Sequence, residues 1–305
     1  MNKSRPPVAL IAGPTASGKS GLALALAERC GGVIINADSA QLYRDLSILS
    51  AAPSAEEMNR AEHRLYGVLD GAEPCSAAEW AAMARGVIEE VLEHDGMLIL
   101  VGGTGLYLNT LINGIAPIPA IDTEVRNEIR AATVDVNRAR LVELDAQAAA
   151  RLNAADSLRI ARALEVVVST GKTLSEWHSH RQGGIGKAIS LRPLVLLPPR
   201  DLLYARCDKR FAEMMERGAV EEVAALLKRG LDPKLPVMRA IGVREIAAML
   251  AGEISREEAV ARGSQATRNY AKRQYTWFAH QPPPEWPRFT QIPSESALEL
   301  LQPSA

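Results

Sequence analysis

Residues 13–20 read Gly13-Pro14-Thr15-Ala16-Ser17-Gly18-Lys19-Ser20 and fit the phosphate-binding pattern G-x-x-x-x-G-K-[ST]. Glycines at both ends let the loop wrap tightly, so that successive backbone N–H groups point inward at phosphate oxygens. Lys19 supplies an ammonium group for the outer phosphate, and the Ser20 hydroxyl can bind a Mg²⁺ ion that bridges two phosphates. The segment therefore predicts a site for a diphosphate or triphosphate, and taken alone it would suit ATP.

The sequence on either side of this loop supplies the strand and the helix that such a loop needs. Residues 8–12 (VALIA) form an apolar run typical of a buried parallel strand, and residues 22–27 (LALALA) strongly favour a helix. Gly31 and Gly32 then end that helix. Because the positive end of the helix dipole lies at the loop, this order supports an anion site.

Further apolar runs predict the rest of the sheet. They occur at residues 33–39, 97–101 and 194–197, and they alternate with helical segments. This pattern favours an α/β fold of the P-loop NTPase-like kind, with a doubly wound and mainly parallel sheet. Asp38 lies at the end of one predicted strand and Thr104 in the turn after another. Since ligands bind beyond the carboxyl ends of such strands, we expect both residues beside the P-loop.

Between residues 118 and 187 the pattern changes to that of a helical insertion. Residues 116–119 (APIP) form a stiff exit and residues 182–186 (QGGIG) a flexible return. Asp122 or Thr123 can cap one helix, and Asp156 can cap another that Gly171 closes. We expect an α/β core of residues 1–117 and 188–305 that ends in long helices at 204–228 and 262–279. After residues 281–284 (QPPP) we expect a loose tail.

Composition excludes several classes of protein. The 305 residues are 47% hydrophobic, but no apolar run approaches the length of a membrane span, and no signal-peptide pattern precedes the first strand. We therefore expect a cytoplasmic chain with no membrane partner. The three cysteines and five histidines show no disulfide or metal-ligand spacing. With a formal net charge of −1, a nucleic-acid partner would need a local basic surface.

Two polar residues near the predicted site have more than one interpretation. Asp38 could cap a helix, bind a metal ion or act as a general base, and its position alone leaves these roles open. Thr104 lies in the Gly102–Gly105 turn, which could simply connect a strand to a helix. Its hydroxyl would nevertheless face the same end of the sheet as the P-loop.

Basic residues are concentrated near the C-terminal end. Two arginine pairs, Arg159 with Arg162 and Arg239 with Arg244, are weak evidence alone, because solvated helix faces commonly look like this. Residues 262–278 contain four cations and no acid, interleaved with aromatic rings and amides, as a polyanion-binding helix requires. The cations are Arg262, Arg268, Lys272 and Arg273. Alternatively the aromatic rings pack on the core, which we expect at least for Trp277.

Taken together, these motifs resemble the tRNA dimethylallyltransferase family in its bacterial form. The matching segments follow the family order along nearly the whole chain: 13–20 (GPTASGKS), 38–43 (DSAQLY), 101–107 (VGGTGLY), 159–166 (RIARALEV), 239–244 (RAIGVR) and 271–278 (AKRQYTWF). The sequence lacks the C-terminal zinc finger of eukaryotic relatives. It has Ser20 where many relatives have threonine, an exchange that keeps the hydroxyl.

The resemblance implies a prenyl transfer from dimethylallyl diphosphate to N6 of the adenosine next to the anticodon, in tRNAs that read codons starting with U. The diphosphate would lie in the P-loop, held by Lys19, by Mg²⁺ at Ser20 and by Arg210. Asp38 would accept the proton of the amine as it attacks, and Thr104 would help to position the groups.

The resemblance also implies an extensive contact with the anticodon stem-loop of tRNA, shared between the insertion and the core, and no obligate protein partner. The implied contact residues are Asp38, Ser39, Ala40, Gln41, Thr104, Arg126, Leu158, Arg159, Ile160, Ala161, Arg162, Arg239, Ala240, Ile241, Gly242, Val243 and Arg244.

The main alternative is a P-loop kinase of a small metabolite or nucleoside, in which Asp38 would activate a hydroxyl for attack on ATP. The insertion and the basic segment would then lack a purpose. A non-enzymatic alternative is an RNA-binding NTP switch, but no guanine-reading N-K-x-D element follows the P-loop.

Overall fold

The computed structural model describes residues 5–93 and 96–301, and their contacts divide them into two compact units. The core unit comprises the described residues up to Leu111 and from Ile185 onward, and the insertion unit comprises Ile112–Gly184. The sequence prediction placed these boundaries at residues 118 and 187. The structure moves them because the backbones of Ile115 and Gln182 exchange two hydrogen bonds of 3.0 Å, which joins the two connecting segments to each other.

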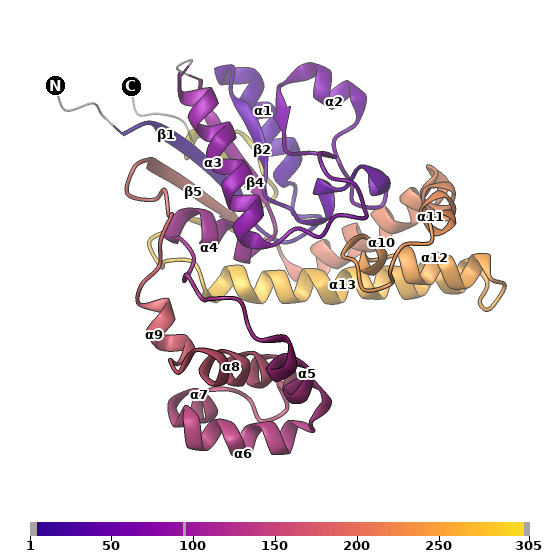
Figure 1. Ribbon diagram of the computed structural model, residues 1–305. Helices are drawn as coiled ribbons and strands as arrows, with labels where there is room; N and C mark the ends of the chain where they lie inside the picture. Colours follow the sequence, from indigo (N-terminus) through magenta and orange to yellow (C-terminus); the bar gives the residue numbers. More distant parts are fainter. Residues whose placement is uncertain (1–4, 94–95, 302–305) are drawn as a thin grey trace. The chain divides into compact units, whose positions relative to one another are not determined.

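The core unit is built on a six-stranded sheet in which every pair of neighbouring strands is parallel (Figure 1). The strand order is β3-β2-β4-β1-β5-β6. The strands are β1 (Pro7–Ala12), β2 (Val33–Asn36), β3 (His63–Arg64), β4 (Leu98–Gly102), β5 (Ser190–Leu196) and β6 (Arg288–Phe289). The residues of β2 and β4 are buried along their whole length, as expected of strands covered on both faces. The predicted α/β fold with a parallel sheet is confirmed.

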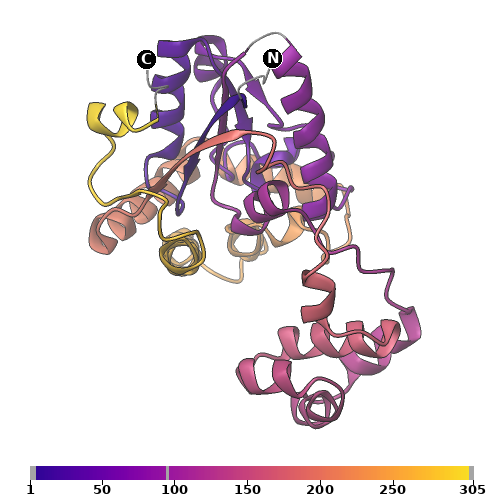
Figure 2. The same cartoon turned by 90° about the vertical axis from the view of Figure 1, so that its left-hand side faces the viewer.

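Helices cover both faces of this sheet, and Figure 2 shows α1 and α3 on opposite sides of it. The helices of the core unit are α1 (Lys19–Cys30), α2 (Ala55–Arg60), α3 (Ala77–Glu93), α4 (Gly105–Asn113, which reaches the unit boundary), α10 (Arg200–Glu216), α11 (Ala219–Lys228), α12 (Val243–Leu250), α13 (Arg256–His280) and α14 (Glu295–Glu299). Short 3₁₀ turns occur at η1 (Ala40–Leu42), η2 (Arg44–Leu46) and η3 (Val237–Arg239). In Figure 1 the long helix α13 crosses below the carboxyl ends of the strands.

The helix predicted after the P-loop is confirmed, whereas the long helix predicted at residues 204–228 is interrupted. Gly31 ends α1 in a left-handed conformation, with its N–H bonded to the Ala27 carbonyl oxygen. Gly218, with φ 109°, separates α10 from α11. A residue in the left-handed conformation cannot continue an α-helix. The apolar spacing of residues 204–228 continues across Gly218, so the spacing alone did not reveal the break.

The loose tail predicted after residue 284 is wrong. Residues Arg288 and Phe289 pair in parallel with the last two residues of β5. Ala297, Leu298 and Leu301 join the apolar cluster around α1, and Glu295 forms a 2.5 Å ion pair with Arg29. These three apolar residues, in and just after α14, anchor the short helix, and the proline-rich sequence before them hid this signal.

The insertion unit is entirely helical among the elements that it contains, as predicted. Its helices are α5 (Thr123–Ala131), α6 (Val134–Leu144), α7 (Ala146–Arg151), α8 (Ser157–Thr170) and α9 (Leu174–His178). Asp122 caps α5, Asp156 caps α8, and Gly171 ends α8 in a left-handed conformation. Ile129, Leu141, Ile160 and Leu164 are fully buried at the centre of the unit. In the part of the chain that the structure describes, no helix is both long and apolar enough to cross a membrane.

Candidate active site

The P-loop connects the carboxyl end of β1 to the first turn of α1. Gly18 is the N-cap of α1 with φ 95°, a left-handed conformation that favours glycine. The Lys19 ammonium folds back and donates to the Pro14 carbonyl oxygen at 2.7 Å. A Cβ atom at Gly13 would lie 2.5 Å from the carbonyl oxygen of Leu196 in β5, so a larger residue would not fit there. The loop thus wraps around a basic centre at the positive end of α1.

Two cations converge on this loop. The guanidinium of Arg210, from α10, donates a hydrogen bond to the Thr15 hydroxyl. Burial lowers the pKa of Lys19 to about 8; the nearby Asp38 carboxylate opposes this shift, and the Arg210 charge adds to it. Burial also lowers the pKa of Arg210. Two half-buried positive charges repel each other, and a bound anion would stabilise both of them.

The pKa of Lys19 leads to a testable pH dependence. Below pH 8 the ammonium is charged in the free protein, and above pH 8 it loses its proton. We therefore expect the affinity for inorganic pyrophosphate to fall above pH 8, approaching about tenfold per pH unit. Calorimetric titrations from pH 7 to 9.5 measure this. Arginine keeps its charge over this range, so the affinity of Lys19→Arg should fall less steeply with pH than that of wild type. An equally steep fall in both proteins would contradict the lowered pKa of Lys19.

A cavity of about 1040 Å³ opens next to the P-loop. Lys19, Ser20, Asp38, Gln41 and Arg210 line it, together with Arg206 and Lys209 of α10 and Arg217, which directly follows α10. Its other walls are residues that the sequence analysis did not assign to the site: the segment 47–55, Glu57 and the segment Ile292–Ser294. A Cβ atom at Gly18 would lie 3.1 Å from Pro293 Cγ, so the C-terminal segment reaches the phosphate loop itself. Nothing in the local sequence of 292–294 indicates this role.

Asp38 is held just beyond β2 by a buried asparagine. The side chain of Asn36 accepts a hydrogen bond from the Asp38 N–H at 2.7 Å and donates to the carbonyl oxygens of Asp38 and Leu65. One Asp38 carboxylate oxygen accepts from the Ala40 N–H at 3.0 Å. The carboxylate therefore has a fixed direction at the edge of the cavity, and Ser39, not Asp38, is the N-cap residue of η1.

Thr104 is packed against the same segment. Its N–H donates to the Ala37 carbonyl oxygen at 3.2 Å, and its hydroxyl oxygen accepts from the Ser39 N–H at 3.0 Å. A Cβ atom at Gly102 would lie 2.2 Å from the Ala37 carbonyl group, so only glycine allows this approach. The two turns that follow β2 and β4 thus place Asp38 and Thr104 at one edge of the sheet, as the sequence predicted.

Three tyrosine phenol groups are close enough to Asp38 to feel its charge, and no sequence pattern predicted this. Burial, and after it the Asp38 charge, raises the pKa of Tyr66 and of Tyr270. Tyr107, whose pKa burial also raises, stacks on Trp80 with 4.7 Å between the ring centroids. These residues come from three separate segments, so sequence spacing carries no trace of their proximity. Because the pKa of each phenol is raised, the three hydroxyl groups stay protonated and add no negative charge near the carboxylate.

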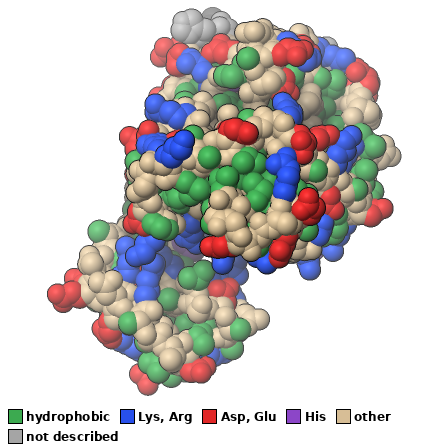
Figure 3. Space-filling view, turned by 90° about the vertical axis from the view of Figure 1, so that its right-hand side faces the viewer, with side chains coloured by type: hydrophobic (Ala, Val, Ile, Leu, Met, Phe, Trp, Pro, Cys, Tyr) green, Lys and Arg blue, Asp and Glu red, His purple; other side chains and the backbone are tan. Residues whose placement is uncertain are grey.

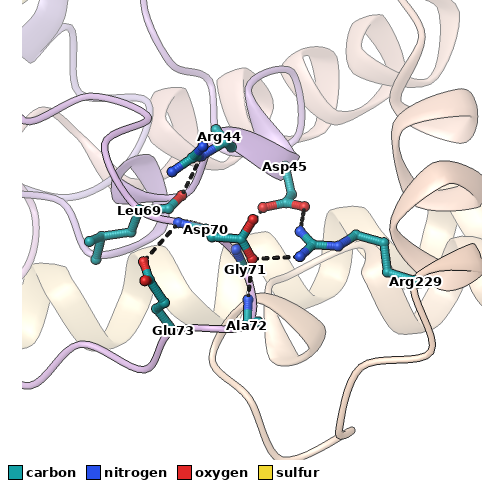
Figure 4. Close-up of polar contacts among 8 residues, drawn as sticks. All are labelled: Arg44, Asp45, Leu69, Asp70, Gly71, Ala72, Glu73 and Arg229. Atoms are coloured by element: carbon teal, nitrogen blue, oxygen red, sulfur yellow. Dashed lines mark hydrogen bonds and ion pairs between the residues drawn. The ribbon is translucent and has the colours of Figure 1, made fainter.

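The loop after Asp38 is fixed to α11 by charged groups. Figure 4 shows the Arg229 guanidinium between the carboxylates of Asp45 and Asp70, the latter at 2.5 Å. Asp45 also accepts a hydrogen bond from the Gly71 N–H at 2.8 Å. Because Asp45 is nearly buried, water screens the attraction within this pair less than in a fully exposed ion pair.

A carboxylate of α11 holds the adjoining turn. Glu222 accepts hydrogen bonds from the Ser47 hydroxyl and from the N–H groups of Ile48 and Leu49, at 2.9 to 3.0 Å. Ser47 and Ile48 line the cavity. One wall of the cavity is thus built on α11.

The basic segment 262–278 lies on α13, but it is less free of acids than its sequence suggests. Glu258, one turn earlier, pairs with Arg262 at 2.5 Å, and Asp208 of α10 pairs with Arg268. Lys272 and Arg273 remain exposed, and Arg273 lies over the Tyr270 ring. Phe278 is fully buried, while half-buried Trp277 packs against Gly105. The partner of Arg268 could not be foreseen, because it comes from a helix far away in the sequence.

The segment 239–244 precedes and begins α12. Arg239 and Arg244 are exposed at its ends, whereas Gly242 and Val243 are buried between them. A Cβ atom at Gly242 would lie 2.7 Å from a methyl group of Leu49, which places this segment beside the turn held by Glu222. The two arginines are therefore available to a partner and the middle of the motif is structural.

In the insertion unit, the predicted contact residues lie on α5 and α8. Leu158 is 81% exposed and the Arg159 side chain 76%, whereas Ile160 is fully buried and belongs to the core of the unit. A contact through the Ile160 side chain is therefore ruled out. Arg162 lies 3.8 Å from the fully buried carboxylate of Glu165, which also pairs with Arg130 of α5 at 2.7 Å. Figure 3 shows Lys and Arg side chains gathered on one face of this unit.

Comparison with known proteins identifies close relatives along nearly the whole chain. A family model described as IPP transferase matches residues 41–281. The tRNA dimethylallyltransferase of Erythrobacter litoralis (strain HTCC2594) is 62% identical over 289 residues, which are 93% of this chain and 91% of the relative. The enzyme of the same name from Sphingopyxis alaskensis is 58% identical over 295 residues and 96% of both chains.

Solved structures agree with these relatives. The full-length tRNA isopentenylpyrophosphate transferase of Bacillus halodurans is 32% identical, with a TM-score of 0.70 over 98% of this chain and 95% of that one. A eukaryotic dimethylallyltransferase, described as acting on tRNA, is 28% identical with a TM-score of 0.75, over 89% of this chain and 69% of that one.

Proposed function

The chain belongs to the IPP transferase family of tRNA dimethylallyltransferases, and from this premise we propose that it transfers a dimethylallyl group from dimethylallyl diphosphate to N6 of the adenosine next to the anticodon of tRNA. One observation supports this chemistry above the others. A P-loop with two desolvated cations shares a cavity with a fixed carboxylate, Asp38. The first suits a leaving diphosphate and the second suits an amine that must lose a proton.

The donor would lie with its diphosphate against the P-loop. As the bond between the allylic carbon and oxygen breaks, negative charge grows on the diphosphate, and Lys19 and Arg210 stabilise it. Both cations are half-buried, so water screens their attraction for that charge less than it would in free solution. The P-loop therefore serves a departing group and not a transferred phosphate.

Mg²⁺ fits the oxygen donors at this position. The Ser20 hydroxyl is exposed and lines the cavity with Asp38, and hard oxygen donors are those that Mg²⁺ prefers. The described residues contain no group of three or more His, Cys, Asp or Glu side chains suited to a metal ion, so a cation here would rely on Ser20 and phosphate oxygens. When bound, it would neutralise charge on the diphosphate.

The acceptor amine needs help because its lone pair is delocalised into the adenine ring. Asp38 would accept the proton of N6 as the new bond to carbon forms, and its hydrogen bond to Ala40 directs the carboxylate. Thr104 would help to hold the reacting groups in line. The base must leave the stacked loop to reach Asp38, as in other enzymes that modify a base.

The tRNA contacts that we propose come from both units. Arg239 and Arg244 offer exposed side chains on the core unit, and Arg159 offers one on the insertion unit. Arg126 and Arg162 of the insertion unit are half-buried. Contacts of this kind to phosphates make binding weaken as salt rises. We place the reaction in the cytoplasm, where tRNA is found, and propose that it needs no partner protein.

The test is transfer of labelled dimethylallyl groups to purified tRNA with Mg²⁺ and without ATP. We expect label on the tRNA, and nucleoside mass spectrometry should find it on N6 of the adenosine next to the anticodon. A tRNA with guanosine at that position is the control and should stay unlabelled. Strict dependence on ATP, or label in a phosphorylated small molecule, would instead support the kinase alternative.

A further inference from the structure

A single buried amide connects the two loops of the proposed active site. Gln274 lies on α13 and is almost fully buried. Its side-chain oxygen accepts a hydrogen bond from the Thr15 N–H in the P-loop at 2.8 Å. Its side-chain nitrogen donates to the Gly103 carbonyl oxygen at 2.8 Å. One side chain therefore holds two backbone positions, Thr15 and Gly103, that lie far apart in the sequence.

The fit between Gln274 and the Gly103 turn is tight. A Cβ atom at Gly103 would lie 2.4 Å from the Gln274 amide nitrogen and 3.1 Å from the carbonyl oxygen of Gly13. The Thr104 turn, the P-loop and α13 thus meet with no space for a side chain between them. Because the amide is both donor and acceptor, glutamine satisfies both loops at once, which an ionised carboxylate would not.

Each loop bound by Gln274 carries a different part of the chemistry. Thr15 is followed within the P-loop by Lys19, and its hydroxyl accepts from Arg210. Gly103 directly precedes Thr104, whose hydroxyl accepts from Ser39 next to Asp38. The amide therefore fixes the distance between the cations that hold the donor and the group beside the base. Displacement of reacting groups by about 1 Å lowers rates by about two orders of magnitude.

We propose that Gln274 is a positioning residue of the transfer reaction, which sets the P-loop and the Thr104 turn relative to each other from the helix α13. It touches neither donor nor acceptor. This inference rests on the proposed function in one respect: the rate that Gln274 affects is the rate of dimethylallyl transfer. The alternative, that Gln274 is simply a satisfied amide in the core, predicts a loss of stability without a specific loss of rate.

The test compares Gln274→Met with Gln281→Met, an exposed glutamine at the end of the same helix. Methionine keeps the length of the side chain and removes both hydrogen bonds. We expect the single-turnover rate, with saturating donor and tRNA, to fall by about 10- to 100-fold in Gln274→Met and to stay within about twofold of wild type in Gln281→Met. Affinity for tRNA should be unchanged in both variants.

Two further measurements separate positioning from a structural role. In a Thr104→Ala background, Gln274→Met should lower the rate by much less than in wild type, because both changes disturb the same turn. Affinity for inorganic pyrophosphate should fall by about three- to tenfold, since the Thr15 N–H loses its partner. The pyrophosphate measurement tests the role of Gln274 even if the wild-type protein transfers no prenyl group. Absence of transfer by the wild-type protein would refute only the proposed function.

A folded Gln274→Met protein with wild-type rate and pyrophosphate affinity would overturn the proposal, and so would additive effects with Thr104→Ala. Should this variant not fold, Gln274→Glu allows the same comparison. It keeps the oxygen that accepts from Thr15 but places a carboxylate oxygen against the Gly103 carbonyl group. A wild-type rate in Gln274→Glu would equally overturn the proposal.

Discussion

Asp38→Asn is expected to slow dimethylallyl transfer by about 10²- to 10⁴-fold, the range for removal of a general base. Asparagine has nearly the same shape, and its side-chain oxygen can still accept from the Ala40 N–H, so the turn after β2 should keep its structure. It cannot accept the proton of the amine. Single-turnover transfer at saturating substrates measures the rate, and tRNA affinity should stay within about threefold of wild type.

Asp201→Asn is a matched control for this substitution. Asp201 is exposed in the first turn of α10, and its replacement should leave both rate and affinity near wild type. If Asp38→Asn instead lost tRNA affinity by the same factor as rate, Asp38 would be chiefly an RNA contact. A normal rate in Asp38→Asn would remove the general base from the mechanism.

Lys19→Met is expected to lower kcat/KM for the donor by about 10²- to 10³-fold, as when one preorganised donor to a developing anion is removed. The rest of the P-loop remains, and tRNA affinity should not change. Steady-state kinetics with varied dimethylallyl diphosphate measures this effect. Lys228→Met, at the exposed end of α11, is the control and should behave as wild type.

The thermal stability of Lys19→Met shows whether its lost activity comes from the missing charge or from unfolding. Burial lowers the pKa of Lys19, so the folded protein disfavours its charged form. Below pH 8 the ammonium is charged in both folded and unfolded states, and its desolvation opposes folding. Removal of the charge should therefore leave Tm at pH 7 equal to wild type or higher. A clear fall in Tm would mean that the lost activity reflects unfolding.

Much of the fold follows from short-range patterns. Continuous apolar runs of four to six residues, each followed by a helix, specify buried parallel strands, because only strands covered on both faces tolerate such runs. Once the sheet is parallel, its geometry brings the carboxyl ends of β1, β2 and β4 to one edge. Asp38 and Thr104 could therefore be placed beside the P-loop without any knowledge of their contacts.

What the sequence did not reveal depends on contacts between distant segments. Gln274 stands in a helix with many polar residues, and nothing nearby distinguishes its buried amide from an exposed one. Arg268 has no acid within its own segment, yet Asp208 of α10 lies against it. Ile160 lies within a motif implied to contact tRNA, although helical periodicity turns its side chain into the core. Burial of a single residue is a tertiary property that motif matching does not report.

The segment that follows α13 has a consequence for biosynthesis. Strand β6 completes the sheet, Leu298 and Leu301 cover α1, and Ile292–Ser294 close one wall of the donor cavity. These residues are translated after the P-loop, the insertion unit and α13. While the nascent chain still holds them inside the ribosome, the sheet lacks its edge strand and the cavity lacks a wall. We expect the polypeptide to acquire its capacity for dimethylallyl diphosphate only after this segment has left the ribosome, however early its N-terminal strands assemble.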